Sequence, residues 1–265
     1  MSITSITAEL NIAIIQSALV WQDAKANCDY FADCFTQLRD VDLVILPEMF
    51  NSGFSMQSTQ IAEPMTGPTV QWLQQQAQYY QMAIAGSLAI STELGVVNRL
   101  VFVYPDGSIE HYDKKHLFRM AGEHQHYAAG SARTVVSFKG FRINLQICYD
   151  LRFPVFARNR GDYDVLIYVA NWPEPRRRVW STLLSARAME NQAFVLGCNR
   201  VGVDGNQFSY SGDSMALNYL GEPMVELPAG QAGILTATLR LSDLWQFRKH
   251  FPAALDADAF MLLDN

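Results

Sequence analysis

The chain has 265 residues, of which 49% are hydrophobic and 17% are charged. This composition excludes a largely disordered chain and supplies enough apolar material for a single domain spanning residues 1–265. The net charge of −6 argues against nucleic acid or an anionic membrane as a partner, because both repel an acidic protein.

The first half of the chain alternates apolar strands with amphipathic helices. Nearly continuous apolar runs predict buried strands at 10–16, 41–46 and 82–90. Apolar residues at intervals of three and four predict helices at 23–38 and 69–81. Asp23 is the expected N-cap of the first helix, since its side chain can accept a hydrogen bond from the first turn.

The second half of the chain is richer in hairpins. Turn residues between short apolar runs predict hairpins at 98–112, 134–147 and 214–227. Further strands are expected at 164–170, 193–198 and 232–239, and further helices at 179–191 and 244–249. This mixture predicts an α/β fold of layered sheets with mixed strand directions, covered by helices. Strand ends gather in one crevice of such folds, where we expect Glu48, Cys148 and Asn171 to meet.

The cysteines and the N-terminus bear on the compartment. The spacing of the four cysteines includes no CxxC pair and no zinc-binding pattern, which favours reduced thiols at Cys28, Cys34, Cys148 and Cys198. Segment 1–7 lacks a basic region followed by a long apolar run, so no signal peptide is expected, and no stretch has the length of a transmembrane helix. We therefore expect a cytoplasmic protein that binds neither a metal ion nor a membrane.

Three reactive side chains each stand where an apolar segment breaks. Cys148 ends a strand and is followed at once by polar residues, Glu48 closes the run 43–48, and Lys114 opens the segment 114–118. A thiol, an amine and a carboxylate are the groups that covalent acyl transfer requires. A catalytic thiol must ionise, so a nearby cation such as Lys114 is expected to lower its pKa, with Glu48 as the general base.

Each of these residues also has an ordinary structural interpretation. A lone half-buried cysteine is more often an inert core residue. Lys114 and its neighbour Lys115 are both typical of solvated loop lysines, and the spacing alone does not choose between them. Glu48 and Glu123 are both compatible with surface carboxylates.

Two further signals leave alternatives open. His116 allows a thiol-protease dyad with Cys148. The basic run 176–178 follows the segment 171–173, and such runs are more often solvated than functional. Its position just after a buried strand also allows Arg176 to bind a carboxylate, because a guanidinium group grips a carboxylate through two hydrogen bonds.

Three segments together resemble the signature motifs of the carbon–nitrogen hydrolase (nitrilase) superfamily, and they occur in that family's order. They are 46–50 (Leu-Pro-Glu-Met-Phe), 112–118 (Tyr-Asp-Lys-Lys-His-Leu-Phe) and 147–154 (Ile-Cys-Tyr-Asp-Leu-Arg-Phe-Pro). The strand pattern around them matches over essentially the whole chain. The resemblance implies an α-β-β-α sandwich of two mixed sheets, paired across a helical face into a homodimer or a higher homo-oligomer.

The resemblance also implies a role for individual residues. The catalytic triad of the family falls on Glu48, Lys114 and Cys148, and Lys115 is not the catalytic lysine. A second glutamate, seven residues before a glycine, falls on Glu123. The implied mechanism uses Lys114 and the backbone N–H of Tyr149 to stabilise an oxyanion and needs no metal or organic cofactor. The candidate substrate-binding residues are Phe54, Asn171, Trp172 and Arg176, with Arg152 as a brace for the loop after the nucleophile.

Finer features are similar to those of bacterial omega-amidases. They lie in the segments 50–54, 116–120, 171–173 and 199–202. Such enzymes hydrolyse the terminal amide of 2-oxo dicarboxylic acid monoamides such as 2-oxoglutaramate and 2-oxosuccinamate. Many true nitrilases carry Cys-Trp-Glu where this chain has 148–150 (Cys-Tyr-Asp), which favours an amide substrate. The alternatives are a hydrolase of carbamoyl compounds or aliphatic nitriles, and a catalytically silent interaction protein on the same fold.

Overall fold

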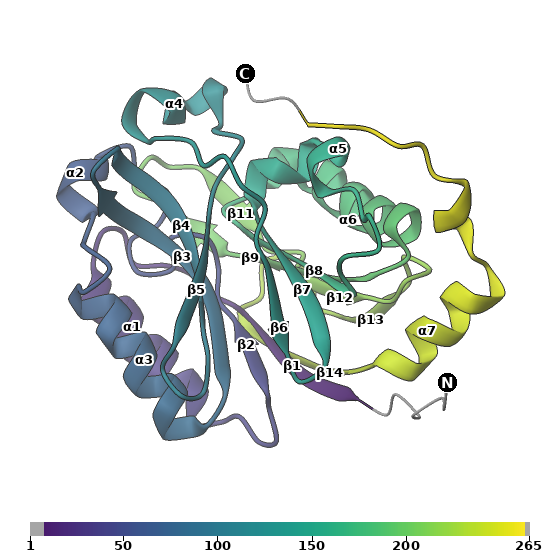
Figure 1. Cartoon of the computed structure of the whole chain (residues 1–265). Helices are drawn as coiled ribbons and strands as arrows, with labels where there is room; N and C mark the ends of the chain where they lie inside the picture. The colour runs from purple at the N-terminus through teal and green to yellow at the C-terminus, as the bar shows by residue number, and fades with distance from the viewer. Residues whose placement is uncertain (1–7, 263–265) are drawn as a thin grey trace.

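Two six-stranded mixed sheets pack face to face in the computed structural model, which describes residues 8–262 (Figure 1). Segment 1–7, where no signal peptide is expected, lies outside the described residues. The first sheet has the strand order β14 (Gly233–Arg240), β1 (Glu9–Gln16), β2 (Leu43–Ile45), β3 (Ala83–Thr92), β4 (Gly95–Val103), β5 (Ile109–Asp113). The second has the order β13 (Pro223–Glu226), β12 (Met215–Leu217), β9 (Phe194–Asn199), β8 (Val165–Ala170), β7 (Phe141–Ile147), β6 (Val135–Phe138).

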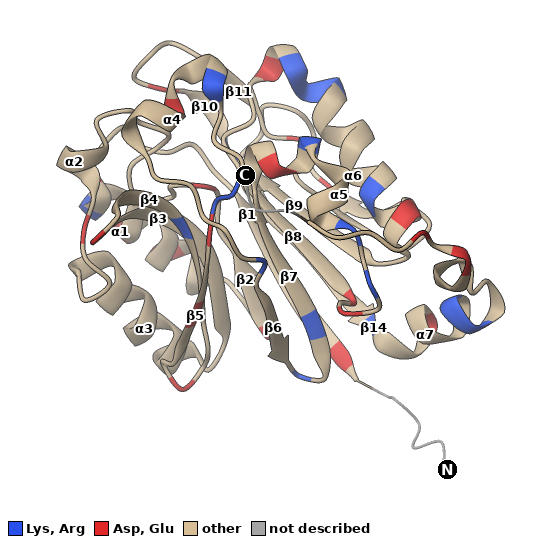
Figure 2. Ribbon diagram, turned by 45° about the horizontal axis from the view of Figure 1, so that its top comes forward, with Lys and Arg blue, Asp and Glu red and all other residues tan. Residues whose placement is uncertain are grey.

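The pairing of the strands explains why the apolar runs are nearly continuous. In each sheet the central strands are parallel, β1 with β2 and β3 in one and β7 with β8 and β9 in the other, and antiparallel strands flank them. Alternate residues of β1 then face two different apolar layers. Ile12 and Ile14 pack between the sheets, whereas Ala13 and Ile15 pack on the helix side. Charged residues are accordingly sparse along the strands (Figure 2).

Helices cover the outer faces of both sheets, which gives the four layers α-β-β-α that the resemblance implies. The first sheet is covered by α1 (Ala24–Phe35) and α3 (Pro68–Tyr80), and the second by α5 (Pro154–Ala157) and α6 (Arg177–Asn191) (Figure 1). Asp23 caps α1 as expected, and its carboxylate accepts the Ala26 N–H at 2.9 Å. The C-terminal helix α7 (Leu241–His250) follows β14. None of the helices between residues 8 and 262 has the length and apolar character needed to cross a bilayer.

The structure adds elements that the sequence patterns do not indicate. β4 begins at Gly95 and pairs along its whole length with β3, so a two-residue turn at Glu93 and Leu94 joins them into a further hairpin. This turn lacks the Asn-Gly or Asp-Gly signal that marks many tight hairpins. The additional short elements are α2 (Ser58–Ile61), α4 (Glu123–His126) and the ribbon of β10 (Val201–Val203) and β11 (Ser209–Ser211).

A buried carboxylate ties α7 to the second sheet. Asp164 accepts hydrogen bonds from Arg142 at 2.8 and 3.0 Å and from Arg248 of α7 at 2.8 Å. Burial by itself raises the pKa of this carboxyl, but the bonds and charges of the two arginines outweigh burial, so the pKa is lowered. A carboxyl with a lowered pKa stabilises the fold above the pKa of the unfolded chain and loses that contribution as the pH falls.

We therefore expect Asp164→Asn to lower the free energy of unfolding at pH 7 by about 3–5 kcal/mol, because two guanidinium groups lose their partner. Urea titrations should show the two proteins converging in stability as the pH falls below about 4, where an unfolded aspartate takes up its proton. Asp29→Asn is the control, since the ion pair of Asp29 with Lys25 is exposed to solvent and contributes little to stability. An equal loss in both variants would contradict this role of Asp164.

Candidate active site

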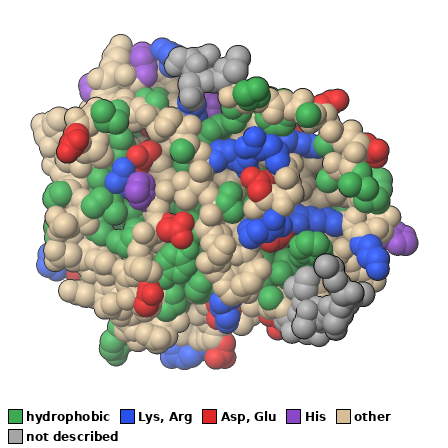
Figure 3. Space-filling view, viewed as in Figure 1, with side chains coloured by type: hydrophobic (Ala, Val, Ile, Leu, Met, Phe, Trp, Pro, Cys, Tyr) green, Lys and Arg blue, Asp and Glu red, His purple; other side chains and the backbone are tan. Residues whose placement is uncertain are grey.

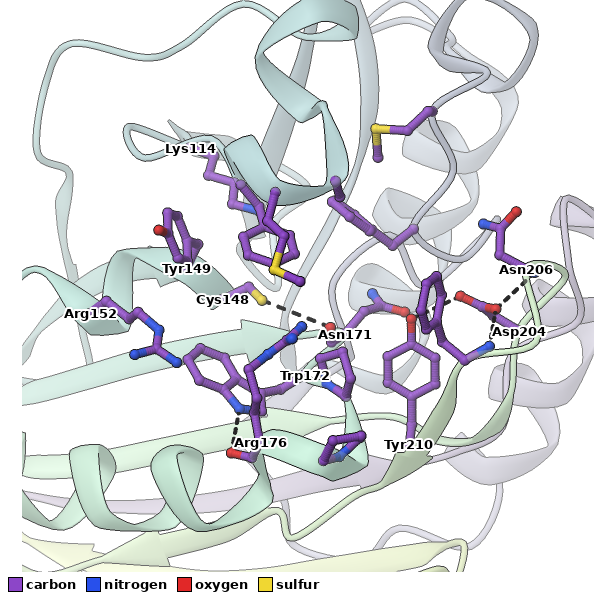
Figure 4. A pocket seen from close by; sticks show the side chains of 18 residues that line it. Lys114, Cys148, Tyr149, Arg152, Asn171, Trp172, Arg176, Asp204, Asn206 and Tyr210 are labelled. Carbon is purple, nitrogen blue, oxygen red and sulfur yellow. Dashed lines mark hydrogen bonds between the residues drawn. The ribbon is translucent and has the colours of Figure 1, made fainter.

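A cavity of about 720 Å³ opens where the ends of several strands meet (Figure 4). Lys114 follows β5, Cys148 follows β7 and Asn171 follows β8, and all three line the cavity. The backbone N–H of Asn171 donates to Glu48 Oε2 at 2.8 Å, and the Cys148 Sγ lies 4.0 Å from the Asn171 carbonyl oxygen. The three strand ends that we expected to meet therefore do so.

Lys114 is the centre of a buried charge cluster. Its Nζ donates to Glu48 Oε1 at 2.8 Å and to Glu123 Oε1 at 3.0 Å, and all three side chains are fully buried. Burial by itself lowers the pKa of a lysine, but the two carboxylates outweigh burial and raise the pKa of Lys114 well above its usual value. Lys114 is therefore a fixed ammonium ion, and its Nζ lies 5.1 Å from the centre of the Phe54 ring.

The carboxylate of Glu48 is held by three donors. Oε1 accepts from Lys114 and from Asn98 Nδ2, each at 2.8 Å, and Oε2 accepts the backbone N–H of Asn171. An ionised carboxylate offers about four lone-pair sites, so Oε2 can accept one more hydrogen bond.

The backbone just after Glu48 is strained. Met49 has a φ of 46°, a conformation that residues with side chains seldom adopt and that persists only where the surrounding structure imposes it.

Glu123 stands at the start of α4 and faces the same ammonium. Its Oε2 accepts the backbone N–H of Phe118 at 2.5 Å. Burial raises the pKa of this carboxyl, the charge of Lys114 opposes that rise, and the charge of Glu48 adds to it, with a net increase. The residue seven positions after Glu123 is a glycine for a steric reason. A Cβ at Gly130 would collide with the carbonyl oxygen of Asp113.

Cys148 sits on a tight turn that a buried aspartate holds. The chain passes from β7 into the 3₁₀ turn Cys148–Arg152, and Cys148 itself has a φ of 44°. Asp150 accepts the N–H of Ile147 at 3.0 Å and the hydroxyl of Tyr112 at 2.9 Å. This carboxylate therefore fastens the turn that carries the thiol to the strand that precedes Lys114.

His116 contacts Asp150 and Phe153 and not Cys148. Its Nδ1 lies 2.7 Å from Asp150 Oδ1, and its ring stacks on Phe153 with the ring centres 3.9 Å apart. His116 is not among the residues that line the cavity with Cys148. The geometry gives no support to the protease-like pair of His116 and Cys148.

The thiol of Cys148 is not a resting thiolate. Burial raises its pKa well above the usual value, the charge of Glu48 raises it further, and the charge of Lys114 opposes the rise without cancelling it. The charge of Lys114 lowers the pKa of the thiol as expected, but burial, which was not visible in the sequence, outweighs it. A neutral thiol needs a base at the moment of attack.

The turn after Cys148 also offers backbone donors. The first N–H groups of a helical turn have no carbonyl partner within that turn, and Tyr149 is the second residue of this one. The side chain of Tyr149 lines the cavity and packs against Phe118, with the ring centres 5.0 Å apart.

Two guanidinium groups line the cavity (Figure 4). Arg176 lies over the Phe118 ring at 5.3 Å, and Arg152 lies over the Trp172 ring at 5.4 Å. The indole N–H of Trp172 donates to the Arg176 carbonyl oxygen at 2.9 Å, which fixes the segment that carries this arginine. Of the three consecutive arginines only Arg176 lines the cavity, and Arg177 instead binds Asp213.

Several residues of the site are not among those predicted from the sequence. Asn98 reaches both buried carboxylates, Asp150 holds the nucleophile turn, and the loop between β10 and β11 forms a wall of the cavity. Asp204 shapes this loop by accepting the N–H of Phe208 at 3.0 Å and the hydroxyl of Tyr210 at 2.8 Å. Of these residues, Asn98 alone could have been noticed in the sequence, because it is a polar residue inside an apolar strand.

No group of three or more His, Cys, Asp or Glu side chains that could hold a metal ion occurs in the described part of the chain. The acid, amine and thiol are brought together in one cluster, and two arginines line the same cavity. Such an arrangement can deprotonate a thiol, stabilise an oxyanion and hold an anionic substrate.

Comparisons with known proteins agree with this description. The omega-amidase YafV of Yersinia enterocolitica is 49% identical over 254 residues, covering 96% of this chain and 99% of that protein. A 2-oxoglutaramate amidase of Bacillus subtilis is 32% identical over 219 residues, covering 81% and 84%. A Xanthomonas campestris protein, solved with an arsenic adduct in its active site, has a TM-score of 0.94 and 49% identity, covering 96% and 99%.

The family comparison covers nearly the whole described chain. Residues 11–249 match the model of the carbon–nitrogen hydrolase family, and the Yersinia and Xanthomonas proteins match at nearly full length. The matched region includes Glu48, Lys114, Glu123 and Cys148. The chain therefore belongs to the carbon–nitrogen hydrolase (nitrilase) family.

Proposed function

We propose that this protein is an omega-amidase that hydrolyses the terminal amide of 2-oxo dicarboxylic acid monoamides to the acid and ammonia. The observation that carries the proposal is the buried cluster of Glu48, Lys114 and Glu123 beside the Cys148 thiol, in a cavity that also presents Arg176. The 49% identity to an omega-amidase and the similarity to a 2-oxoglutaramate amidase support this substrate class.

Acylation begins with the neutral thiol. Glu48 takes the proton from Cys148 through the free lone pair of Oε2 while the sulfur attacks the amide carbon. The negative charge that develops on the amide oxygen is stabilised by the Lys114 ammonium and the Tyr149 N–H, and one such donor lowers the barrier by about 3 kcal/mol. Glu123 holds Lys114 in place for this task. Glu48 then returns the proton to the amide nitrogen, the C–N bond breaks, and ammonia leaves a thioester on Cys148.

Deacylation repeats these roles with water. Glu48 takes a proton from the water that attacks the thioester carbon, and Lys114 and Tyr149 again stabilise the oxyanion. The C–S bond breaks, the sulfur recovers its proton from Glu48, and the acid leaves. The proposed steps use no metal and no organic cofactor. Asn171 fixes Glu48 through its N–H, while Phe54 and Trp172 shape the space around the substrate chain.

A release assay tests the function. Ammonia should be released from 2-oxoglutaramate and 2-oxosuccinamate much faster than from glutamine, asparagine or an aliphatic nitrile. Release of carbon dioxide with ammonia from an N-carbamoyl compound would instead favour the carbamoyl branch. An inactive protein that nevertheless folds would point to an interaction role.

The distal carboxylate of the substrate is assigned to Arg176. We expect Arg176→Met to raise the KM for 2-oxoglutaramate by about 10- to 100-fold, because a charge-assisted pair is lost. Hydrolysis of a short neutral amide should change little, since that substrate has no carboxylate to bind.

Two variants sharpen the Arg176 test. Arg178→Met is the matched control, because Arg178 is exposed and does not line the cavity. Arg152→Met addresses the other guanidinium in the cavity. A larger KM effect in Arg152→Met than in Arg176→Met would reassign the carboxylate to Arg152.

We also propose that the protein is cytoplasmic and assembles at least as a homodimer. All four cysteines lie within the described residues and are free, as expected in a reducing compartment. Val155 of α5 and Met189 of α6 are exposed. Basic side chains gather on the face of the molecule shown in Figure 3. Sedimentation of the protein, compared with Met189→Glu, tests whether the surface around Met189 pairs.

A further inference from the structure

A buried amide joins the two carboxylates of the active site, and the mechanism above gives it no role. Asn98 lies in β4 and is fully buried. Its Nδ2 lies 2.8 Å from Glu48 Oε1 and 3.5 Å from Glu123 Oε1. Its backbone carbonyl oxygen accepts the N–H of Lys114 at 3.0 Å, so the same residue also sets the position of the lysine backbone.

Asn98 and Lys114 bridge the same two oxygens. The Lys114 Nζ bonds Oε1 of Glu48 and Oε1 of Glu123, and the Asn98 Nδ2 faces the same pair of atoms. A side-chain amide nitrogen carries two hydrogens, so it can donate to both carboxylates at once. The four groups thus form a closed ring of two acceptors and two donors.

The oxygen of the Asn98 amide shows that the contacts of Nδ2 matter more at this position than those of Oδ1. Asn98 Oδ1 is buried and has no hydrogen-bond partner among the described residues. An unpaired buried carbonyl oxygen is costly, so an asparagine chosen only for packing would be a poor choice here. The contacts of Nδ2 with the two carboxylates explain why an asparagine occupies this position.

We propose that Asn98 is a positioning residue that holds Glu48 and Glu123 in register with Lys114, so that Glu48 can act as the base. The proposal deepens the proposed function and rests on it. Asn98 supplies donors without adding charge, which matters in a pocket where a single ammonium already faces two carboxylates. Hydrogen bonds to a carboxylate favour its ionised form.

The charged and titratable neighbours of this ring come from several elements. Glu48 follows β2, Lys114 follows β5, Glu123 begins α4, Cys148 begins the nucleophile turn and Tyr127 follows α4. Hydrogen bonds from Asn98 favour the ionised forms of the carboxylates, so a variant without these donors should need a higher pH to reach full activity. Activity should then be lost mainly at low pH and recover as the pH rises.

The test is the pH profile of kcat/KM for wild type, Asn98→Ala and Asn98→Asp. Loss of a hydrogen bond to a charged group corresponds to about one to two pKa units, so the acid limb of Asn98→Ala should move up by about one to two pH units. Asn98→Asp preserves the shape but adds a third carboxylate, so its acid limb should move further. Because two variants are used, poor folding of one does not end the test.

Asn27→Ala is the matched control. Asn27 is also a buried asparagine whose Nδ2 donates to several groups, but those groups are the backbone oxygens of Val20, Asp23 and Asn51. Its removal should lower stability and leave the acid limb where it is in wild type. The comparison separates the loss of a buried amide from the loss of this particular pair of contacts.

A second readout does not depend on the substrate. The rate at which iodoacetamide alkylates Cys148, followed by mass spectrometry of the peptide that contains it, should show the same upward shift in the Asn98 variants. If wild type releases no ammonia from any omega-amide but this shift is present, the proposed function fails and the role of Asn98 stands. If both Asn98 variants lose activity uniformly, with the acid limbs of both readouts unmoved, Asn98 is only a packing residue and the inference is overturned.

Discussion

Replacing Cys148 by alanine is expected to reduce kcat for 2-oxoglutaramate by at least about 10⁴-fold, because no other group in the cavity can form the thioester. The fold should survive. Cys148 is a partly exposed residue, its Sγ lies 4.0 Å from the Asn171 carbonyl oxygen, and alanine removes only the sulfur atom. A coupled ammonia assay and a thermal melt on the same sample measure both properties.

The control for this variant is a second cysteine in a different environment. Cys198 lies inside the sandwich, with its Sγ 3.5 Å from the carbonyl oxygens of Ile15 and Ile45. Cys198→Ala should lower the melting temperature and leave kcat within a few-fold of wild type, which is the opposite pattern. Near-normal ammonia release by Cys148→Ala would show that the nucleophile is another group.

Lys114→Met should damage both activity and stability. The substitution keeps the length of the side chain but leaves two buried carboxylates without their cation, and breaking a buried ion pair costs about 3–5 kcal/mol. Burial raises the pKa of Glu123 and the charge of Lys114 opposes that rise, so the pKa of Glu123 should rise further in this variant, and the oxyanion has lost a donor. We expect kcat/KM to fall by at least about 10³-fold. Steady-state kinetics and urea unfolding measure the two effects.

Lys115→Met decides whether the right lysine has been chosen. Lys115 is half-buried, lies outside the cavity lining, and has its backbone N–H bound to the Tyr112 hydroxyl at 3.1 Å. Its side chain takes no part in the buried cluster, so this variant should retain most of the activity. A severe defect in Lys115→Met combined with a mild one in Lys114→Met would mean that the motif has been read one residue out of register.

Much of the fold could be predicted because its strands are buried on both faces. The runs around Ile14 and Ile167 are apolar without a break, and the helices show a clear three-and-four spacing. The tight turn at Glu93 and Leu94 was missed because these residues carry no turn signal. The ribbon of β10 and β11 was missed because each strand has only three residues and little apolar pattern.

The candidate site was only partly predictable for a similar reason. Glu48, Lys114 and Cys148 stand at breaks in apolar segments, so the sequence marks them individually. The contacts of Asn98 and Asp150 join segments that lie far apart in the chain, and no local pattern reports such contacts. The direction of the thiol pKa depends on burial, which is a property of the folded molecule.

The central claim is that Cys148 carries the acyl group during turnover, and acid-quenched mass spectrometry tests it most directly. Wild-type protein mixed with 2-oxoglutaramate and quenched within the first turnovers should show the peptide containing Cys148 heavier by the mass of the substrate minus ammonia. Cys148→Ala should show no such species. Rapid ammonia release by wild type without any adduct on this peptide at any quench time, or with the adduct on a different residue, would contradict the account.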